Sequence, residues 1–301
     1  MQRIDHATIG LAPRAHTEAR PTKNILLMIL DKAFYAFFVL ALFAFAYYFY
    51  VYRHRFLLDL PLLLQGAGTT IWLSVSSMIL ATLFGFIGAM GRLSPIAPIR
   101  WLALLYVEIV RGTPILVQLL LWGFGVSGLL SNLGFDPYTA AYQFMTVIQE
   151  NSFMPGPASQ LFFDAAFYGI LGLSFNYGAY LTEVFRTGIE SVDRGQSEAA
   201  LSLGLNSRQV LFRIVLPQAI RMTIPPFANY FITLVQDTSL LSLLGGVIEI
   251  QQLTTSLASP LSSDPNAMLF VYIFGASLFF IICYPLALLA RFLEGRLAIA
   301  Y

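Results

Sequence analysis

The chain alternates long apolar segments with short polar ones, and six of the apolar segments are long enough to cross a bilayer. A helix needs about 20 apolar residues to span the hydrocarbon core. The predicted spans lie at residues 33–52, 66–90, 101–130, 166–187, 224–249 and 268–290. The third is long enough to tilt or to begin as an interfacial helix. The pattern predicts an all-α integral membrane protein with about six transmembrane helices.

The composition agrees with a membrane protein. Hydrophobic residues make up 57% of the 301 residues and charged residues 11%, whereas a soluble domain carries about a quarter charged residues. The net charge of +1 gives no support for nucleic-acid binding. The single cysteine, Cys283, rules out an intramolecular disulfide, and the three histidines lie too far from it for a zinc site. We therefore expect no metal ligands.

Lysine and arginine are distributed unevenly between the two sides of the predicted spans. With the N-terminus in the cytoplasm, 14 of the 17 fall inside, only Arg53 and Arg55 fall outside, and Arg111 lies within a span. Because loops rich in lysine and arginine stay cytoplasmic, we predict that both termini are cytoplasmic. The first span is longer than a signal-peptide core and lacks a cleavage pattern after it, so we expect a retained helix.

The polar segment 196–217, between the fourth and fifth spans, has the pattern of two short helices joined by a glycine. Gly204 suits a left-handed helix stop, Asn206 or Ser207 suits the next N-cap, and Pro217 is expected to end the second helix. The apolar face of that helix consists of Val210, Leu211, Ile214 and Val215. On periodicity alone, the segment is equally well read as an interfacial helix on lipid headgroups.

The spacing in this elbow is more specific than its periodicity. Glu198-Ala199-Ala200 is followed by three residues, Gly204, nine residues and then Ile214-x-Leu216-Pro217. This series resembles the EAA motif of ABC importer permeases, whose loop forms a coupling helix in a groove of the ATP-binding subunit. The resemblance assigns coupling to Glu198, Ala199, Ala200, Gly204, Arg208, Ile214 and Pro217.

Three longer stretches extend the resemblance to about residues 60–292. They are "YVEIVRGTPILVQ", "NYGAYLTEVFRTGIESVDRGQSEAA" and "LPQAIRMTIPPFANYFITLVQDTSLLSLL", and they resemble permeases of the histidine, glutamine and arginine type. The implied fold is a type I ABC importer transmembrane domain, MetI-like, in the bacterial inner membrane. The implied function is ATP-driven import of polar amino acids by alternating access. One departure is Gln236, where the subfamily commonly has lysine; it favours acidic or neutral substrates over basic ones.

The resemblance also implies partners and a division of the chain. We expect two ATP-binding subunits, a second permease chain, identical or paralogous, and a periplasmic or surface substrate-binding protein. The expected parts are a cytoplasmic tail (1–24), an extra N-terminal helix with linker (25–65), the permease core (66–292) and a cytoplasmic C-terminus (293–301). Within the core we expect a periplasmic insertion at 131–164 and the coupling loop at 188–217.

The chain shows no nucleotide-binding or catalytic motif of its own. It has no G-x-x-x-x-G-K-[ST] sequence, and its only lysines, Lys23 and Lys32, are not in glycine-rich loops. We therefore expect no enzymatic activity and no cofactor in this chain, with ATP and magnesium bound by the partner ATPase.

Ionisable residues within membrane spans are costly and mark substrate pathways. Here they are Glu108, Arg111, Glu183, Asp237 and Glu249. Broken helices expose backbone groups at mid-depth, and we expect breaks at 112–114 and 225–226. The predicted substrate-binding residues are Arg111, Thr113, Gln118, Asn229, Thr233, Gln236, Asp237 and Ser239. Alternatively, Glu108 pairs with Arg111, and the hydroxyl groups bond their own helix backbone.

Two other classes of function remain open at this point. An ion-gradient-driven secondary transporter or channel subunit would also need polar groups within its spans, but it gives no reason for the glycine-hinged elbow. A membrane scaffold gives no reason for charges within spans.

Overall fold

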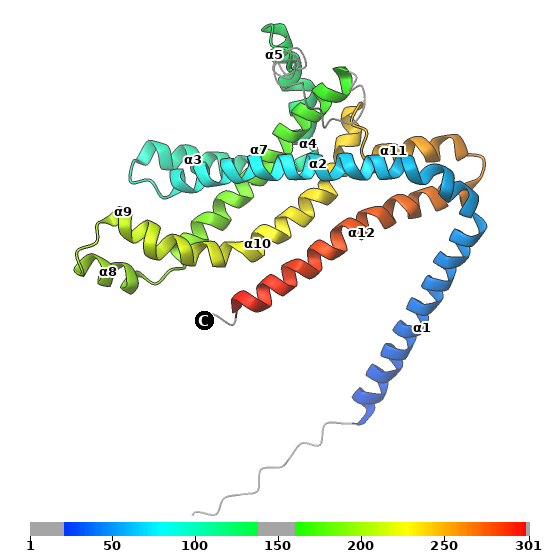
Figure 1. Ribbon diagram of the computed structural model, residues 1–301, viewed down its shortest axis with the longest axis horizontal. Coiled ribbons are helices and arrows are strands. Elements are labelled where there is room, and N and C mark those ends of the chain that lie inside the picture. The colour runs from blue at the N-terminus through cyan, green and yellow to red at the C-terminus, as the bar shows by residue number, and fades with distance from the viewer. Residues whose placement is uncertain (1–20, 138–159, 299–301) are drawn as a thin grey trace, which may run out of the picture. The chain divides into compact units, whose positions relative to one another are not determined.

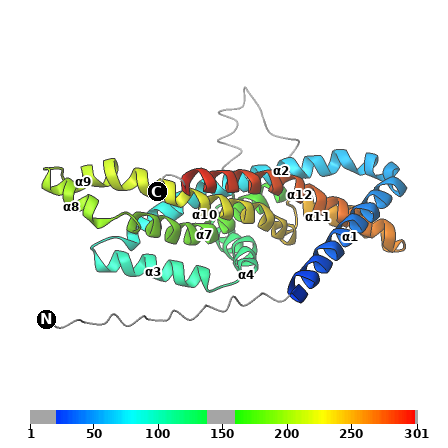
Figure 2. The ribbon, with the colours of Figure 1, turned by 90° about the horizontal axis from the view of Figure 1, so that it is seen from below.

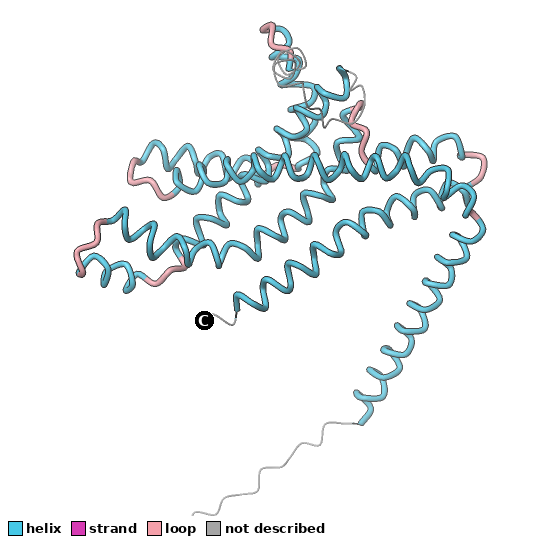
Figure 3. The backbone as a smooth tube through the Cα atoms, in the orientation of Figure 1, coloured by secondary structure: helices cyan, strands magenta, loops and turns pink. Residues whose placement is uncertain are grey.

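The computed structural model describes residues 21–137 and 160–298, and it is helical throughout most of them (Figure 3). The chain divides into two units, residues 1–53 and 54–301. The first unit contains α1, Pro21–Val51, a helix of 31 residues. Large apolar and aromatic side chains of α1, such as Phe34 and Phe43, are exposed, as expected for a helix that is apolar all round and faces lipid. Residues 1–20, most of the predicted tail, lie outside the described part.

The second unit contains the remaining helices (Figure 1). In chain order they are α2 (Arg53–Arg92), α3 (Ala97–Arg111), α4 (Ile115–Leu120), the π-helical turn η1 (Leu121–Val126), α5 (Ser127–Asn132), α7 (Gln160–Glu190), α8 (Arg194–Ser202), α9 (Ser207–Val210), the π-helical turn η2 (Leu211–Val215), α10 (Leu216–Asp237), the 3₁₀ segment η3 (Thr238–Leu244), α11 (Ile250–Ala258), the 3₁₀ turn η4 (Ser259–Leu261) and α12 (Pro265–Ala298).

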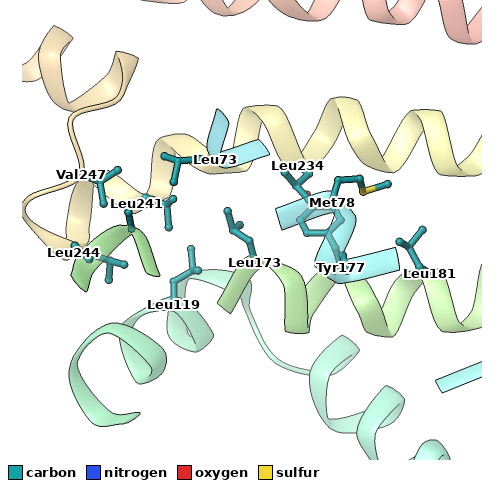
Figure 4. Close-up of a cluster of buried hydrophobic side chains, with 13 residues drawn as sticks. Leu73, Met78, Leu119, Leu173, Tyr177, Leu181, Leu234, Leu241, Leu244 and Val247 are labelled. Atoms are coloured by element: carbon teal, nitrogen blue, oxygen red, sulfur yellow. The ribbon is translucent and has the colours of Figure 1, made fainter. Parts of the chain in front are cut away.

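The helix α10 lies at the centre of this unit. It packs against α7 on one side and α12 on the other, while α3 and α4 pack on α7, and α11 packs on α12. The hydrophobic core between these helices includes Leu119, Leu173, Leu181, Leu234 and Leu241, all fully buried (Figure 4). Figures 1 and 2 both show α8 and α9 projecting from one end of the unit.

Glycines of α2 allow close helix packing, as expected for small residues in membrane helices. A Cβ atom at Gly85 would come within 2.6 Å of the Leu181 Cβ on α7. A Cβ atom at Gly66 would lie 3.1 Å from the backbone nitrogen of Ile250, at the start of α11. The 40-residue helix α2 therefore touches α7 near one end and α11 nearer the other.

Within the described residues, four helical stretches are long and apolar enough to cross a membrane. They are Met28–Val51, Arg53–Arg92, Ile115–Asn132 and Pro265–Leu297. The expected span 166–187 lies within α7, and the expected span 224–249 begins in α10 and continues past the end of that helix at Asp237. Neither α7 nor α10 meets the same measure of hydropathy. The total of six spans and their orientation therefore stay predictions.

Of the two predicted breaks one is confirmed, and two other predictions are wrong. The chain breaks at residues 112–114, between α3 and α4, as expected, so the span 101–130 consists of more than one helix. The predicted break at Pro225-Pro226 is absent, since α10 runs through both prolines. Each proline removes one backbone donor, but packing against α7 and α12 supports the helix on both sides. The linker expected before residue 66 is helical as well: α2 already begins at Arg53.

The actual break in the fifth span follows Asp237. Residues 238–244 form the 3₁₀ segment η3, and Gly245 and Gly246 then adopt φ values of +65° and +125°. Glycine is the residue that tolerates such values, so this pair marks the break in the sequence. Glu249, predicted as a pathway residue, is instead fully buried and caps α11 by accepting hydrogen bonds from the backbone nitrogens of Gln251 (2.7 Å) and Gln252 (2.6 Å).

Candidate functional site: the elbow and the tyrosine cluster

The elbow of residues 188–217 is built from local capping interactions. The Asp193 carboxylate accepts a hydrogen bond from the Gly195 backbone nitrogen (2.7 Å) at the start of α8. Gly204 has φ of +85°, which confirms the predicted left-handed position. Asn206 caps α9 in a capping box: its side chain accepts from the Gln209 backbone, and the Gln209 side chain accepts from the Asn206 backbone, both at 2.9 Å.

A small core holds the two helices of the elbow together. Ala200 from α8 packs with Val210 and Val215 from the second helix, and all three are buried. Leu211 and Ile214 pack against the same core, as the predicted apolar face requires. Ala200 and Ile214 therefore support the elbow from inside, whereas Glu198, Ala199, Gly204, Arg208 and Pro217 are exposed on it.

Pro217 does not end the second helix, contrary to the prediction. The chain stays helical from Ser207 through α10, with the π-helical turn η2 immediately before Leu216. Proline is tolerated in the first turn of a helix, and Pro217 occupies that place in α10. The side-chain amide nitrogen of Gln218 donates to the Ile214 carbonyl (3.0 Å) and to the side-chain oxygen of Gln196. The bond to Gln196 connects α10 to α8.

The tip of the elbow exposes apolar side chains that the motif did not point to. Leu203 is 82% exposed, immediately before Gly204, and Phe212 is 57% exposed. The guanidinium of Arg208 lies 6.0 Å from the centre of the Phe212 ring. A hydrophobic tip with a basic rim is suited to bind in an apolar groove of another protein.

The break between α3 and α4 is fixed by Gln118, which is buried. Its amide nitrogen donates to the carbonyls of Val110 (2.7 Å) and Thr113 (3.1 Å) and to the Thr113 hydroxyl (2.7 Å). Its amide oxygen accepts from the side chain of Asn176 on α7 (3.1 Å). Because both ends of this amide are engaged, Gln118 and Thr113 position the break, and their role in substrate binding stays a prediction.

A cluster of three tyrosines joins two of the predicted substrate-binding residues. The guanidinium of Arg111 lies 5.3 Å from the ring centre of Tyr180, and Tyr180 contacts Tyr230, with ring centres 5.4 Å apart. Tyr177 contacts both other rings at 6.4 Å and donates its hydroxyl to Asp237 (2.6 Å). We name Arg111, Tyr177, Tyr180, Tyr230 and Asp237 the tyrosine cluster.

The cluster brings a cation and a carboxylate into contact with one set of aromatic rings. Arg111 comes from the end of α3, Tyr177 and Tyr180 from α7, and Tyr230 and Asp237 from α10. The alternative pairing of Arg111 with Glu108 is absent from the described part of the chain. The tyrosines were missed in the sequence, although the spacing Tyr177–Tyr180 on one helix and Tyr230–Asp237 on another is that of residues sharing a face.

The predicted substrate residues of α10 and η3 other than Asp237 make different contacts. The Asn229 side chain donates to Glu294 of α12 (3.3 Å), and the Thr233 hydroxyl donates to the Asn229 carbonyl (3.1 Å). Asn229, Thr233 and Gln236 are exposed on α10, and Ser239 is half-buried in η3. Within the described residues, no three His, Cys, Asp or Glu side chains are grouped as a metal site.

Comparison with known proteins places this arrangement among transport proteins. Residues 81–299 match the family described as "Binding-protein-dependent transport system inner membrane component". The chain is 33% identical over 237 residues to the L-cystine transport system permease protein TcyB of Bacillus subtilis, covering 79% of this chain and 87% of that one. It is 28% identical over 240 residues to the glutamine transport system permease protein GlnP of Escherichia coli K12, covering 80% and 94%.

Solved structures give the same placement. One, described as a crystal structure of an amino acid ABC transporter with histidines, has a TM-score of 0.60 at 29% identity and covers 78% of this chain and 94% of that one. The MetNI methionine ABC transporter in an inward-facing conformation has a TM-score of 0.55 at 15% identity, covering 77% and 96%. This second likeness concerns the fold alone.

Proposed function

Because the chain belongs to the family of binding-protein-dependent transport system inner membrane components, we propose that its elbow couples it to separate ATP-binding subunits. The chain is the multi-pass inner-membrane permease of an amino-acid ABC importer. It is a transport component without catalytic activity of its own, and its family implies ATPase and binding-protein partners. The all-helical fold resembles that of an amino acid ABC transporter and of the MetNI methionine ABC transporter.

The observation that carries the coupling role is the exposed tip formed by Leu203 and Gly204. Leu203 is 82% exposed, and Gly204 at φ +85° has no atom within 4 Å of where a Cβ would lie. Such a tip leaves apolar surface in water unless a partner covers it. The elbow begins at the end of α7 and returns into α10, so a partner holding the tip is mechanically connected to two of the three helices that form the tyrosine cluster.

The proposed assembly contains two permease chains and two ATP-binding subunits, with ATP and magnesium bound by the latter. The second permease is identical or paralogous. A substrate-binding protein delivers the amino acid to the outer face, and closure of the ATP-binding subunits below rearranges the permeases for alternating access. The termini are cytoplasmic, and the segment 131–164, of which residues 138–159 lie outside the described part, is periplasmic.

The proposed substrate path passes the tyrosine cluster. An amino acid presents a carboxylate that suits the guanidinium of Arg111 and an ammonium group that suits the carboxylate of Asp237. The faces of Tyr180 and Tyr230 are suited to an ammonium group as well. Arg111 is exposed and Asp237 half-buried, so both remain reachable. Asn229, Thr233, Gln236 and Ser239 contribute neutral polar groups along α10 and η3.

A matched pair of glycines tests the coupling role. Gly134 has φ of +81°, follows the 75% exposed Leu133 and, like Gly204, has no atom near a Cβ. Alanine at either left-handed position costs roughly 1–2 kcal/mol of backbone strain. Replacing Leu203 by serine removes the apolar anchor, and Leu133→Ser is its control. The purified complex with its ATPase and binding protein is assayed for subunit retention and for ATPase stimulation by L-glutamine, L-cystine, L-arginine and L-histidine.

We expect Leu203→Ser to weaken ATPase binding roughly tenfold, the effect of truncating an anchor that contributes about 1–2 kcal/mol. Gly204→Ala should reduce the stimulation of ATPase activity by the amino acid while being expressed at a level similar to that of the wild type. Leu133→Ser and Gly134→Ala should behave as wild type in both assays. The proposal would be overturned if the variants at Leu203 and Gly204 changed ATPase binding and stimulation no more than the variants at Leu133 and Gly134.

A further inference from the structure

One ion-pair network joins α2 to the end of α7. The Glu183 carboxylate of α7 accepts from Arg92 of α2 through Oε1 (3.2 Å) and from Arg186 through Oε2 (2.7 Å). Arg186 also pairs with Glu190, the last residue of α7. The side chains of Arg92, Glu183 and Arg186 are only 18–23% exposed. The contact between Arg92 and Glu183 is therefore more shielded from water than a surface pair, and losing one partner strands a charge.

The backbone around this network is closely packed. Gly85 of α2 lies against Leu181, and Gly88 lies against Thr182, on the turns of α7 that precede Glu183. Further along α7, a Cβ at Gly188 would meet the side chain of Thr223 in α10. The end of α7 thus contacts both α2 and α10, and a displacement of α7 affects its packing against both helices.

The elbow starts immediately after this point. α7 ends at Glu190, and α8 begins at Arg194 after a three-residue turn. In the N-terminal half of α2, the Thr70 hydroxyl accepts a hydrogen bond from the Ile250 backbone nitrogen (3.3 Å). Gly66, one turn earlier, contacts the start of α11. The span from Thr70 to Arg92 is about 33 Å of helix at 1.5 Å per residue.

We propose that Arg92 and Glu183 are positioning residues that tie α2 to the movement of the elbow, so that α2 transmits ATP-driven motion to α11. This proposal rests on the coupling role of the elbow. Arg92 is the last residue of α2, where the helix dipole favours a cation, and its pair with Glu183 resists sliding of α2 along α7. Among the described residues, a second hydrogen bond between these helices runs from the Ser174 hydroxyl to the Ser77 carbonyl (3.0 Å).

The test measures how much ATP is hydrolysed for each amino acid taken up. Wild-type and variant complexes, with ATPase and binding protein, are reconstituted in proteoliposomes and supplied with whichever of radiolabelled L-glutamine, L-cystine, L-arginine or L-histidine the wild type imports. Arg92→Met should retain assembly and ATP hydrolysis but lower uptake per ATP about tenfold, as for mutations along a coupling chain. Glu183→Gln should have the same effect, and Arg92→Lys should restore most of the ratio.

The matched control is Arg100→Met, because the Arg100 side chain, at the start of α3, donates to the Ser94 carbonyl (3.3 Å) and forms no ion pair within the described residues. The proposal is overturned if Arg92→Met and Glu183→Gln both keep the wild-type ratio of uptake to ATP hydrolysis. It is also overturned if both variants fail to assemble, because the pair would then have a purely structural role. Leu203→Ser, measured in parallel, distinguishes failure of the proposed function from failure of the present inference. If it leaves the complex fully coupled, the proposed function fails; if it uncouples while the Arg92 and Glu183 variants do not, only the present inference fails.

Discussion

Tyr177 donates its hydroxyl to the carboxylate of Asp237 at 2.6 Å, and this bond joins α7 to α10 inside the tyrosine cluster. Both helices continue into the elbow, α7 at its start and α10 at its end. A movement of the elbow that separates or rotates these helices therefore acts directly on the hydrogen bond. We propose that opening of this bond makes the Asp237 carboxylate available to an ammonium group, which would link ATPase docking to substrate binding.

Replacing Asp237 by asparagine tests this role. The amide oxygen still accepts from Tyr177, so we expect the protein to fold and assemble and to hydrolyse ATP without substrate. Uptake should fall at least tenfold, because a hydrogen bond to a charged group contributes about 1.5–3 kcal/mol. Radiolabelled uptake and basal ATPase activity are measured on the same preparation. Loss of expression or of subunit assembly would instead identify a structural carboxylate.

Arg111 is expected to bind the substrate carboxylate from its place over Tyr180. Arg111→Gln should raise the KM for the imported amino acid by roughly tenfold or more, since a charge-assisted bond is lost. Arg111→Lys keeps the charge but not the planar stacking on the ring, so its KM should lie between those of the wild type and of Arg111→Gln. An unchanged KM in Arg111→Gln would remove this residue from the substrate path.

The sequence predicts the elbow well because its structure is local. Gly204, Asn206 and the apolar face of the second helix act through neighbours within a few positions, and the cap and the left-handed glycine are confirmed. Leu203 could not be recognised in the same way. Its exposure depends on how the two helices fold against Ala200 and Val210, which is a tertiary property.

The tyrosine cluster was predicted only in part. Charged residues inside apolar spans are conspicuous, so Arg111 and Asp237 were found, but tyrosines are common in this chain and do not stand out. The location of the break was also mispredicted: Pro225-Pro226 is a strong local signal, yet packing on both sides of α10 preserves the helix, and the chain breaks at Gly245-Gly246 instead. Local signals were outweighed there by contacts between distant helices.

Gln118 offers a test of the difference between a positioning residue and a binding residue. Gln118→Leu leaves Asn176, Val110 and Thr113 without their buried partner, which should cost roughly 1–3 kcal/mol of stability. The purified variant should show a lower unfolding temperature and reduced yield. Gln65→Leu, at an exposed position of α2, is the matched control and should keep wild-type stability. Equal stability of the two variants would contradict the positioning role.

The orientation of the chain in the membrane is the last prediction, and two exposed serines test it. Ser131 lies at the end of α5, and Ser207 lies at the start of α9 in the elbow. Fourteen of the 17 lysines and arginines fall on the side of the elbow when the N-terminus is placed inside, and such loops stay cytoplasmic. In a Cys283→Ser background, cysteine at Ser131 should therefore react with a membrane-impermeant maleimide in intact spheroplasts. Cysteine at Ser207 should react only after lysis, because the coupling elbow has to meet an ATPase in the cytoplasm. The reverse pattern would place the elbow outside and would exclude coupling to cytoplasmic ATP.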